Sequence, residues 1–217
     1  MKKVSVVFLG LGFLLALIGM SLGEPGPAVS EEEAAVASPS FNFRMVRSTG
    51  AVAANCLQGA RADVSVVSRG PVEVMTVDLE GLPPNTDFDF FVLQIPNAPF
   101  GMAWYQGDIE TNRLGEGHGR FVGRFNVETF VVAQPPGGQA APVVHHQLPF
   151  PDASMNPATE PIHMYHLGLW FNSPQDAMAA GCPDTVTRFN GEHNAGIQAL
   201  STRNFSDLQG PLRHLRP

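Results

Sequence analysis

The sequence predicts an all-β fold, an antiparallel β-sandwich or a jelly-roll-like arrangement with one short helix near residues 174–180. The sequence contains about eight or nine short strand-like segments, several of which alternate apolar and polar residues with a period of two, separated by turn-forming Gly, Pro and Asn. Helical patterns do not alternate with these segments, as they do in folds with a parallel sheet. The 217 residues include 22 Gly and 19 Pro, less than the combined share of roughly 25–30% seen in low-complexity chains. We therefore expect a packed core.

The N-terminus has the pattern of a secretory signal peptide. Lys2 and Lys3 precede an uncharged apolar stretch that ends at Gly23, and the first acid follows at Glu24. A basic start, an apolar middle and small residues before the first acid predict cleavage after Gly23. The alternative is an uncleaved membrane anchor, since about 20 apolar residues can span a bilayer. We expect a protein that is secreted or held in the cell envelope, and a contact with the membrane only in the alternative in which the signal peptide stays uncleaved.

The charge of the mature chain restricts its partners. Removal of residues 1–23 removes both lysines and leaves 11 arginines against 20 acids, a net charge of −9. Such a chain is not expected to bind nucleic acid or an anionic lipid surface. Residues 24–40 have no apolar periodicity and are interpreted as a disordered tether. Residues 41–203 form a single predicted β-sandwich domain, and residues 204–217 a C-terminal tail.

The first half of this domain reads as strands in chain order. Residues 41–46 alternate, and residues 61–80 contain two alternating runs around the turn Arg69-Gly70-Pro71. The predicted core faces of these two runs consist of Ala62, Val64 and Val66 and of Met75, Val77 and Leu79. After a turn at residues 81–86 comes a strand at residues 87–95 whose middle, residues 90–93, is apolar on both faces, which predicts a central strand.

Residues 102–132 read as a long hairpin with its turn at residues 112–117. This pairing predicts that Glu110 lies opposite Arg120, and that Asp108 lies diagonal to Arg120 and Arg124. The carboxylates of the hairpin would then have basic partners.

A Pro/Gly-rich connection at residues 133–161 is longer than an ordinary loop and either crosses between sheets or forms a functional lobe. Residues 162–171 follow as one apolar strand. Ser173 and Pro174 then provide an N-cap and a first helical residue, and Gly181 ends the helix. Residues 185–189 and 196–202 are the predicted closing strands.

The two cysteines, Cys56 and Cys182, predict one disulfide bond, because an exported chain folds in an oxidising compartment. Two free thiols are the alternative.

Two segments carry a resemblance. The segment from Gly81 to Phe88, Gly-Leu-Pro-Pro-Asn-Thr-Asp-Phe, resembles the Gly-Leu-x-Pro-x-Thr-x-Tyr corner of fibronectin type III and related immunoglobulin-like domains. This resemblance implies sandwich architecture, although Phe88 replaces the tyrosine and removes its hydroxyl group. Residues 166–182 and 189–194 resemble segments of uncharacterised secreted bacterial proteins. That resemblance implies export and no particular activity.

Histidines are the candidate metal ligands, namely His145, His146, His163, His166 and His193. A spacing of three puts His163 and His166 on opposite faces of one strand, so this pair does not chelate by itself. A copper or zinc site would need one of the two to meet the others. The alternative, in which the histidines are loop or half-buried strand residues and no cofactor is bound, is the preferred prediction.

Paired carboxylates are the candidate catalytic groups. Asp87 and Asp89 share a strand face at a separation that an inverting glycosidase could use. The same spacing occurs at Asp78 with Glu80 and at Asp108 with Glu110, which favours an ordinary solvent-facing pattern. We assign no catalytic residue.

Aromatic residues Trp104, Tyr105, Tyr165 and Trp170 form a candidate platform for a sugar or a peptide. The alternative is that these rings belong to the core. The sequence thus predicts an exported, non-enzymatic β-sandwich that binds an extracellular protein or polysaccharide. The alternatives are a copper- or other metal-binding sandwich and a secreted hydrolase.

Overall fold

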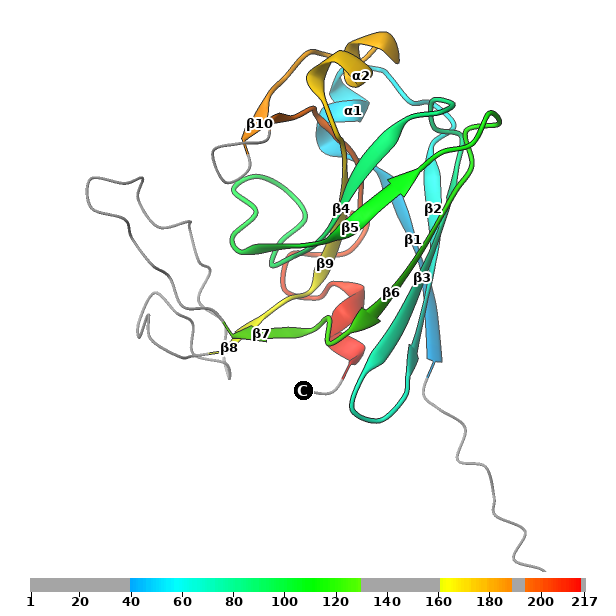
Figure 1. Ribbon diagram of the computed structural model, residues 1–217. Helices are drawn as coiled ribbons and strands as arrows, with labels where there is room; N and C mark the ends of the chain where they lie inside the picture. The colour runs from blue at the N-terminus through cyan, green and yellow to red at the C-terminus, as the bar shows by residue number, and fades with distance from the viewer. Residues whose placement is uncertain (1–39, 130–160, 189–193, 216–217) are drawn as a thin grey trace, which may run out of the picture. The chain divides into compact units, whose positions relative to one another are not determined.

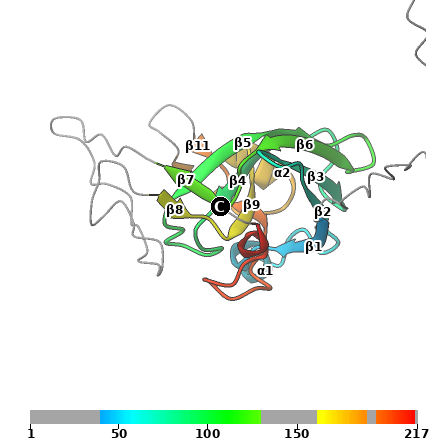
Figure 2. The same cartoon turned by 90° about the horizontal axis from the view of Figure 1, so that it is seen from below.

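Eight antiparallel strands form one curled sheet, a nearly closed barrel, in a computed structural model (Figures 1 and 2). The structure describes residues 40–129, 161–188 and 194–215. In spatial order the strands are β5 (Ala103–Glu110), β4 (Asp87–Leu93), β9 (His166–Phe171), β12 (Gln198–Ser201), β1 (Ser40–Arg47), β2 (Arg61–Ser68), β3 (Glu73–Glu80) and β6 (Gly117–Gly123). The predicted all-β antiparallel class is confirmed. The predicted signal peptide and nearly all of the predicted tether lie outside the described residues.

Two short pairs of strands accompany this sheet. Strand β7 (Val127–Thr129) pairs with β8 (Pro161–His163), and β10 (Thr187–Arg188) pairs with β11 (Asn194–Ala195). The pairing of β7 with β8 brings together the two chain segments that flank the predicted 133–161 connection. Almost all of that connection lies outside the described residues.

The β2–β3 hairpin forms as the alternating pattern predicts. Val64 lies opposite Val77, and Val66 lies opposite Met75. The predicted inner residues of both strands are buried in the main core. Strand β4 is central, as expected, because it pairs with β5 on one side and with β9 on the other. Its inner face contributes Phe88 and Phe90 to the core.

The predicted hairpin at residues 102–132 is wrong as a paired unit. Strands β5 and β6 occupy opposite edges of the sheet and meet at an isolated bridge between Thr111 and Gly117. Each strand instead pairs with a neighbour whose inner face is apolar, β5 with β4 and β6 with β3. Beyond the bridge the seam is filled by side chains, since the ring of Phe121 on β6 stacks on Phe90 at 5.0 Å. The expected charge pairs are therefore not formed: Arg120 lies opposite Thr76.

The predicted single strand at residues 162–171 is two strands, β8 and β9. Between them the Met164 amide donates to the Asn126 carbonyl at 2.8 Å, and the Tyr165 amide donates to the Leu93 carbonyl at 3.0 Å. The chain therefore changes partners between His163 and His166, and this change interrupts the strand.

Two short helices lie at one end of the sheet (Figure 1). The predicted helix is α2 (Pro174–Ala179), whose N-cap Ser173 accepts from the Asp176 amide at 3.1 Å. It is followed by Gly181 at φ +74°, the left-handed conformation that favours glycine. Helix α1 (Thr49–Ala53) was not predicted, because its Gly and β-branched residues have low helix propensity. None of the described helices combines the length and apolar character needed to cross a membrane.

Cys56 and Cys182 follow these two helices, and their sulfur atoms lie 2.05 Å apart, at the distance of a disulfide bond. The predicted pairing of the two cysteines is confirmed at that level. Farther along the chain, a 3-10 helix, η1 (Pro211–His214), packs on the sheet, with Leu212 fully buried and its amide bonded to the Tyr165 carbonyl.

Candidate functional site

Strand β5 exposes two large aromatic side chains at the edge of the sheet. Trp104 and Tyr105 are each 49% exposed. Tyr105 lies opposite Phe91 on the outer face of β4, whereas Trp104 lies opposite Val92, whose side chain belongs to the inner core. Because consecutive residues of a strand point to opposite faces, the two rings flank the edge of the strand and do not share one plane.

A β-bulge separates these aromatics from the acidic end of the strand. The register shifts between Phe90 and Phe91, so that Phe90 lies opposite Gly107 and Phe91 opposite Tyr105. The bulge leaves Tyr105 and Asp108 close enough for a hydrogen bond, which the Tyr105 hydroxyl donates to Asp108 Oδ1 at 2.6 Å. Burial, followed by this hydrogen bond, raises the pKa of Tyr105 above its ordinary value.

Four carboxylates face one another across strands β4 and β5. Asp87 lies opposite Glu110, and Asp89 lies opposite Asp108. Burial raises the pKa of Asp87, and the charges of Asp108, Glu110 and Asp176 raise it further. A hydrogen bond from the Phe88 amide acts in the opposite direction. This part of the surface therefore carries concentrated negative charge. We call Asp87, Trp104, Tyr105, Asp108 and Glu110 together the β5 surface.

An aromatic cluster of Phe91, Phe100 and Trp170 lies on the outer face of β4 and β9, beside the β5 surface. Phe91 contacts Tyr105 on one side and Trp170 on the other, with ring centroids 5.4 Å apart in each pair. Phe100 packs edge-on against Trp170 at 5.2 Å. Trp170 is only 2% exposed. Through Phe91, the cluster thus packs against the ring of Tyr105.

The four rings of the candidate platform accordingly have different environments. Trp104 and Tyr105 are exposed, whereas Tyr165 and Trp170 are buried. The buried pair contributes packing, and the exposed pair remains accessible to a ligand. Searches against protein-family models and curated proteins find no match to this chain.

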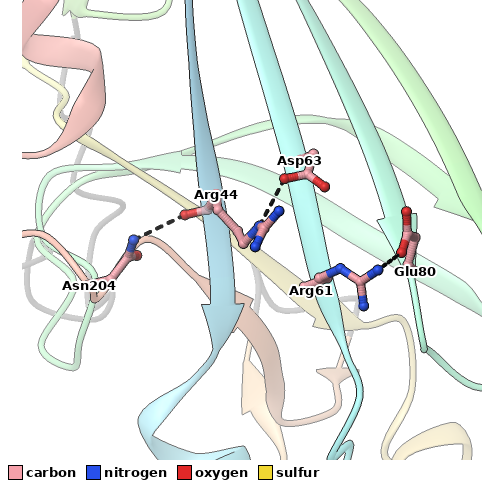
Figure 3. Close-up of polar contacts among 5 residues, drawn as sticks. All are labelled: Arg44, Arg61, Asp63, Glu80 and Asn204. Carbon is pink, nitrogen blue, oxygen red and sulfur yellow. Dashed lines mark hydrogen bonds and ion pairs between the residues drawn. The ribbon is translucent and has the colours of Figure 1, made fainter.

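The outer face of the opposite half of the sheet has a different charge pattern. Arg44 pairs with Asp63 at 2.9 Å, and Arg61 pairs with Glu80 (Figure 3). On the other side of β3, Asp78 forms a hydrogen bond or an ion pair with Nδ1 of His118 on β6, at 2.7 Å. Asp63 and Asp78 lie directly opposite each other across β2 and β3, but each has a basic residue opposite it on its other side, Arg44 and His118 respectively.

The candidate metal ligands are only partly described. His145, His146 and His193 lie outside the described residues. His166 is fully buried, where its Nε2 donates to the Asp207 carbonyl at 2.9 Å and its Nδ1 accepts from the Thr202 hydroxyl at 2.8 Å. Burial lowers the pKa of His166, and its bonds to Asp207 and neighbouring residues offset only part of this effect. His166 therefore holds the segment after β12 in place.

His163 is also buried, and its ring lies against that of Tyr165, tilted by 33° with the centroids 4.0 Å apart. Burial lowers its pKa to about 4. Within the described ranges, no three His, Cys, Asp or Glu side chains are close enough together to hold a metal ion.

Sequence reasoning placed the acids of β5 beside arginines and so missed their true neighbours. One signal was available: residues 90–93, in the middle of the predicted strand, are apolar on both faces, which is typical of a strand with a neighbour on each side. Since β5 follows β4 directly along the chain, it was the nearest candidate for one of those two neighbours.

Proposed function

We propose that the protein is exported and acts outside the cytoplasm, secreted or in the cell envelope, as a non-enzymatic binding protein that uses the β5 surface. The observation that carries this proposal is the exposure of Trp104 and Tyr105 on an edge strand. Nearly all other aromatic side chains close to β5 are packed away from solvent, including Phe88, Phe90 and Trp170. Exposed aromatic residues are enriched where proteins bind ligands and partners.

Two further features support an extracellular site of action. The pattern of residues 1–23 is that of a signal peptide. Cysteine pairs at disulfide distance, such as Cys56 with Cys182, are characteristic of proteins that fold in oxidising compartments.

The two tryptophans allow a direct test of binding, because one is exposed and the other buried. The exported protein would be titrated with extracellular polysaccharides and with peptides while tryptophan emission is recorded. A ligand of the β5 surface is expected to shift the emission of the wild type and of Trp170→Phe, but not that of Trp104→Phe, which retains only the buried ring.

Two results would contradict the proposal. One is a panel of ligands that leaves the emission unchanged, and the other is a ligand whose affinity is the same in the wild type and in a Trp104→Ala, Tyr105→Ala double variant. Export is tested separately by N-terminal sequencing of protein recovered from the medium or the envelope. The expected first residue is Glu24, and an intact Met1 would contradict cleavage.

A further inference from the structure

We infer that two copies of this chain associate end to end, each inserting Leu114 into a hollow beside helix α2 of the other. None of the residues in this contact belongs to the β5 surface, so the inference goes beyond the function proposed above and does not depend on it. It follows from an exposed leucine on a fixed turn, a hollow with apolar walls and a pair of opposite charges beside the two.

Leu114 is the most exposed large hydrophobic side chain among the described residues, at 78%. It lies in the turn between β5 and β6, where the Asn112 side chain accepts from the amides of Leu114 at 2.7 Å and of Glu116 at 3.2 Å. The turn is also fixed to its neighbour, because the Leu82 amide donates to the Gly115 carbonyl at 3.2 Å. An apolar side chain on such a fixed turn loses little conformational freedom when it binds.

The hollow lies beside α2 and has a volume of about 430 Å³. Its walls are formed by Pro174, Gln175, Met178, Asp184, Val186 and Asn194. Met178 and Val186 are 58% and 48% exposed, so the hollow presents two apolar side chains to solvent. Exposed apolar side chains that gather around a hollow are typical of a contact with another molecule.

The turn and the hollow lie at the same end of the sheet, the end that carries α1 and α2 (Figure 1). Contacts join them across this end. The turn at residues 81–86 contacts both the turn at residues 111–117 and the loop after α1. Cys56 in that loop is linked to Cys182, two residues before Asp184 of the hollow. Because leucine and hollow share one end, two copies related by a two-fold axis form the contact twice, and the pair closes on itself.

Charge favours a second copy as the occupant of the hollow. Arg113, directly before Leu114, is exposed, and so is Asp184 in the wall of the hollow. Entry of Leu114 brings these opposite charges together between the two copies. The chain as a whole is acidic, with a formal net charge of −7, but residues 49–60 and 81–86 at this end carry no charged side chain. Two copies therefore meet here with less repulsion than a uniformly acidic surface would cause.

Association is measured by sedimentation of the full exported protein over a wide range of concentrations, where we expect a reversible equilibrium between monomer and dimer. Leu114→Ala removes two apolar contacts from each dimer and is expected to weaken dimerisation at least about tenfold. Leu208→Ala is the matched control, since Leu208 is also exposed, at 47%, but follows β12 at the opposite end of the sheet. It is expected to change dimerisation by less than about twofold. Thermal unfolding of both variants establishes that each is folded.

A charge swap tests which residues meet in the contact. Arg113→Asp alone and Asp184→Arg alone each place like charges against one another between the two copies, and each is expected to weaken dimerisation about tenfold. The variant that carries both substitutions has opposite charges again and is expected to recover most of the lost affinity. Such a recovery requires position 113 of one copy to meet position 184 of the other.

Several outcomes would overturn the inference. A protein that stays monomeric at every concentration lacks the contact, and equal effects of Leu114→Ala and Leu208→Ala would place the association elsewhere. Without recovery in the charge-swapped variant, the two charged residues do not meet. Oligomers that grow beyond the dimer would mean that the contact does not close. Leu114-dependent binding of a monomer to phosphatidylcholine vesicles would assign the turn to a lipid surface. None of these results affects the β5 surface, which tryptophan emission tests separately.

Discussion

The two halves of the sheet carry acids at the same spacing on their outer faces, yet the environments of these acids are opposite. On the β1–β2–β3–β6 half, Asp78 is 61% exposed and faces His118 across the strand pair. On the β5–β4–β9–β12 half, Asp89 is 5% exposed and faces Asp108. Apart from its charged side chains, the outer face of the first half is exposed to solvent, whereas the outer face of the second half is covered by the aromatic cluster around Trp170.

This difference shows that the cross-strand neighbour determines what a carboxylate on a strand does. A basic residue across one side of the ladder makes an acid part of a stable surface, as for Asp63 beside Arg44 and Asp78 beside His118, although these two acids also face each other. A like charge across the strand pair, as for Asp87 and Glu110, is a source of repulsion. The first arrangement contributes solubility. The second concentrates negative charge, at some cost in stability, next to the exposed aromatic rings on which the proposed binding function rests.

The largest predicted effect concerns the link between the two halves. Cys56 follows α1, which comes after β1, and Cys182 follows α2, which comes after β9; the two cysteines are 126 positions apart in sequence. A cross-link that closes so long a loop stabilises by about 5 kcal/mol in the chain-entropy treatment. The Cys56→Ser, Cys182→Ser double variant is expected to lose most of this stability in guanidinium unfolding. Equal unfolding midpoints for the oxidised and reduced wild type would contradict the prediction.

The next effect tests whether the outer aromatic cluster is a second core. Trp170 is buried between Phe91 and Phe100, and its ring lies directly over Gly168, where a Cβ atom would come within 2.4 Å of it. Replacement of a buried Trp by Ala costs about 3 to 5 kcal/mol, because it removes apolar contacts and leaves a cavity. We expect this loss for Trp170→Ala in urea unfolding and a smaller loss for Trp170→Phe.

Val122 provides the control for that substitution, since it occupies the outer face of the opposite half and is 55% exposed. Val122→Ala is expected to change stability by less than about 0.5 kcal/mol. Similar losses for the Trp170 and Val122 variants would show that the two outer faces do not differ as described.

A pH-dependent effect follows from the buried histidine that precedes β9. Because burial lowers the pKa of His163 to about 4, the unfolded chain binds a proton there that the folded chain does not, between the unfolded pKa of about 6.5 and the folded one. Stability is therefore lost as the pH falls through this window, by an amount on the order of 3 kcal/mol. His163→Phe is expected to flatten this part of the stability profile. An NMR titration in which the His163 ring of the folded protein titrates near its ordinary pKa would contradict the prediction.

The sequence identified the elements of this fold better than their neighbours. Period-two alternation located β2, β3 and β4, and capping residues located α2, because these signals are local. The pairing of β5 with β4 was missed because a hairpin turn predicts contact between the strands that it joins, whereas here barrel curvature carries β5 and β6 to opposite edges. The exposure of Trp104 and the burial of Trp170 also depended on that topology. Residue type alone does not distinguish these two rings.

The smallest predicted effect is the most direct test of the comparison between the two halves. Asp87 lies opposite Glu110, and its raised pKa means that its charged form is disfavoured in the folded state. Asp87→Asn keeps an oxygen that can accept from the Phe88 amide but removes the repulsion, so we expect it to stabilise the protein by roughly 0.2 to 1 kcal/mol at neutral pH. The sign of the linkage requires this gain to be present above the raised pKa of Asp87 and to disappear as the pH falls below the ordinary pKa of an aspartate, where the unfolded chain is protonated as well. Asp78→Asn on the other half removes the repulsion from Asp63 opposite it but also removes the partner of His118, so we expect a smaller gain than for Asp87→Asn, or none. Urea unfolding of both variants across this pH range measures the contrast, and a gain for Asp78→Asn equal to that for Asp87→Asn would show that the cross-strand neighbour does not govern these carboxylates.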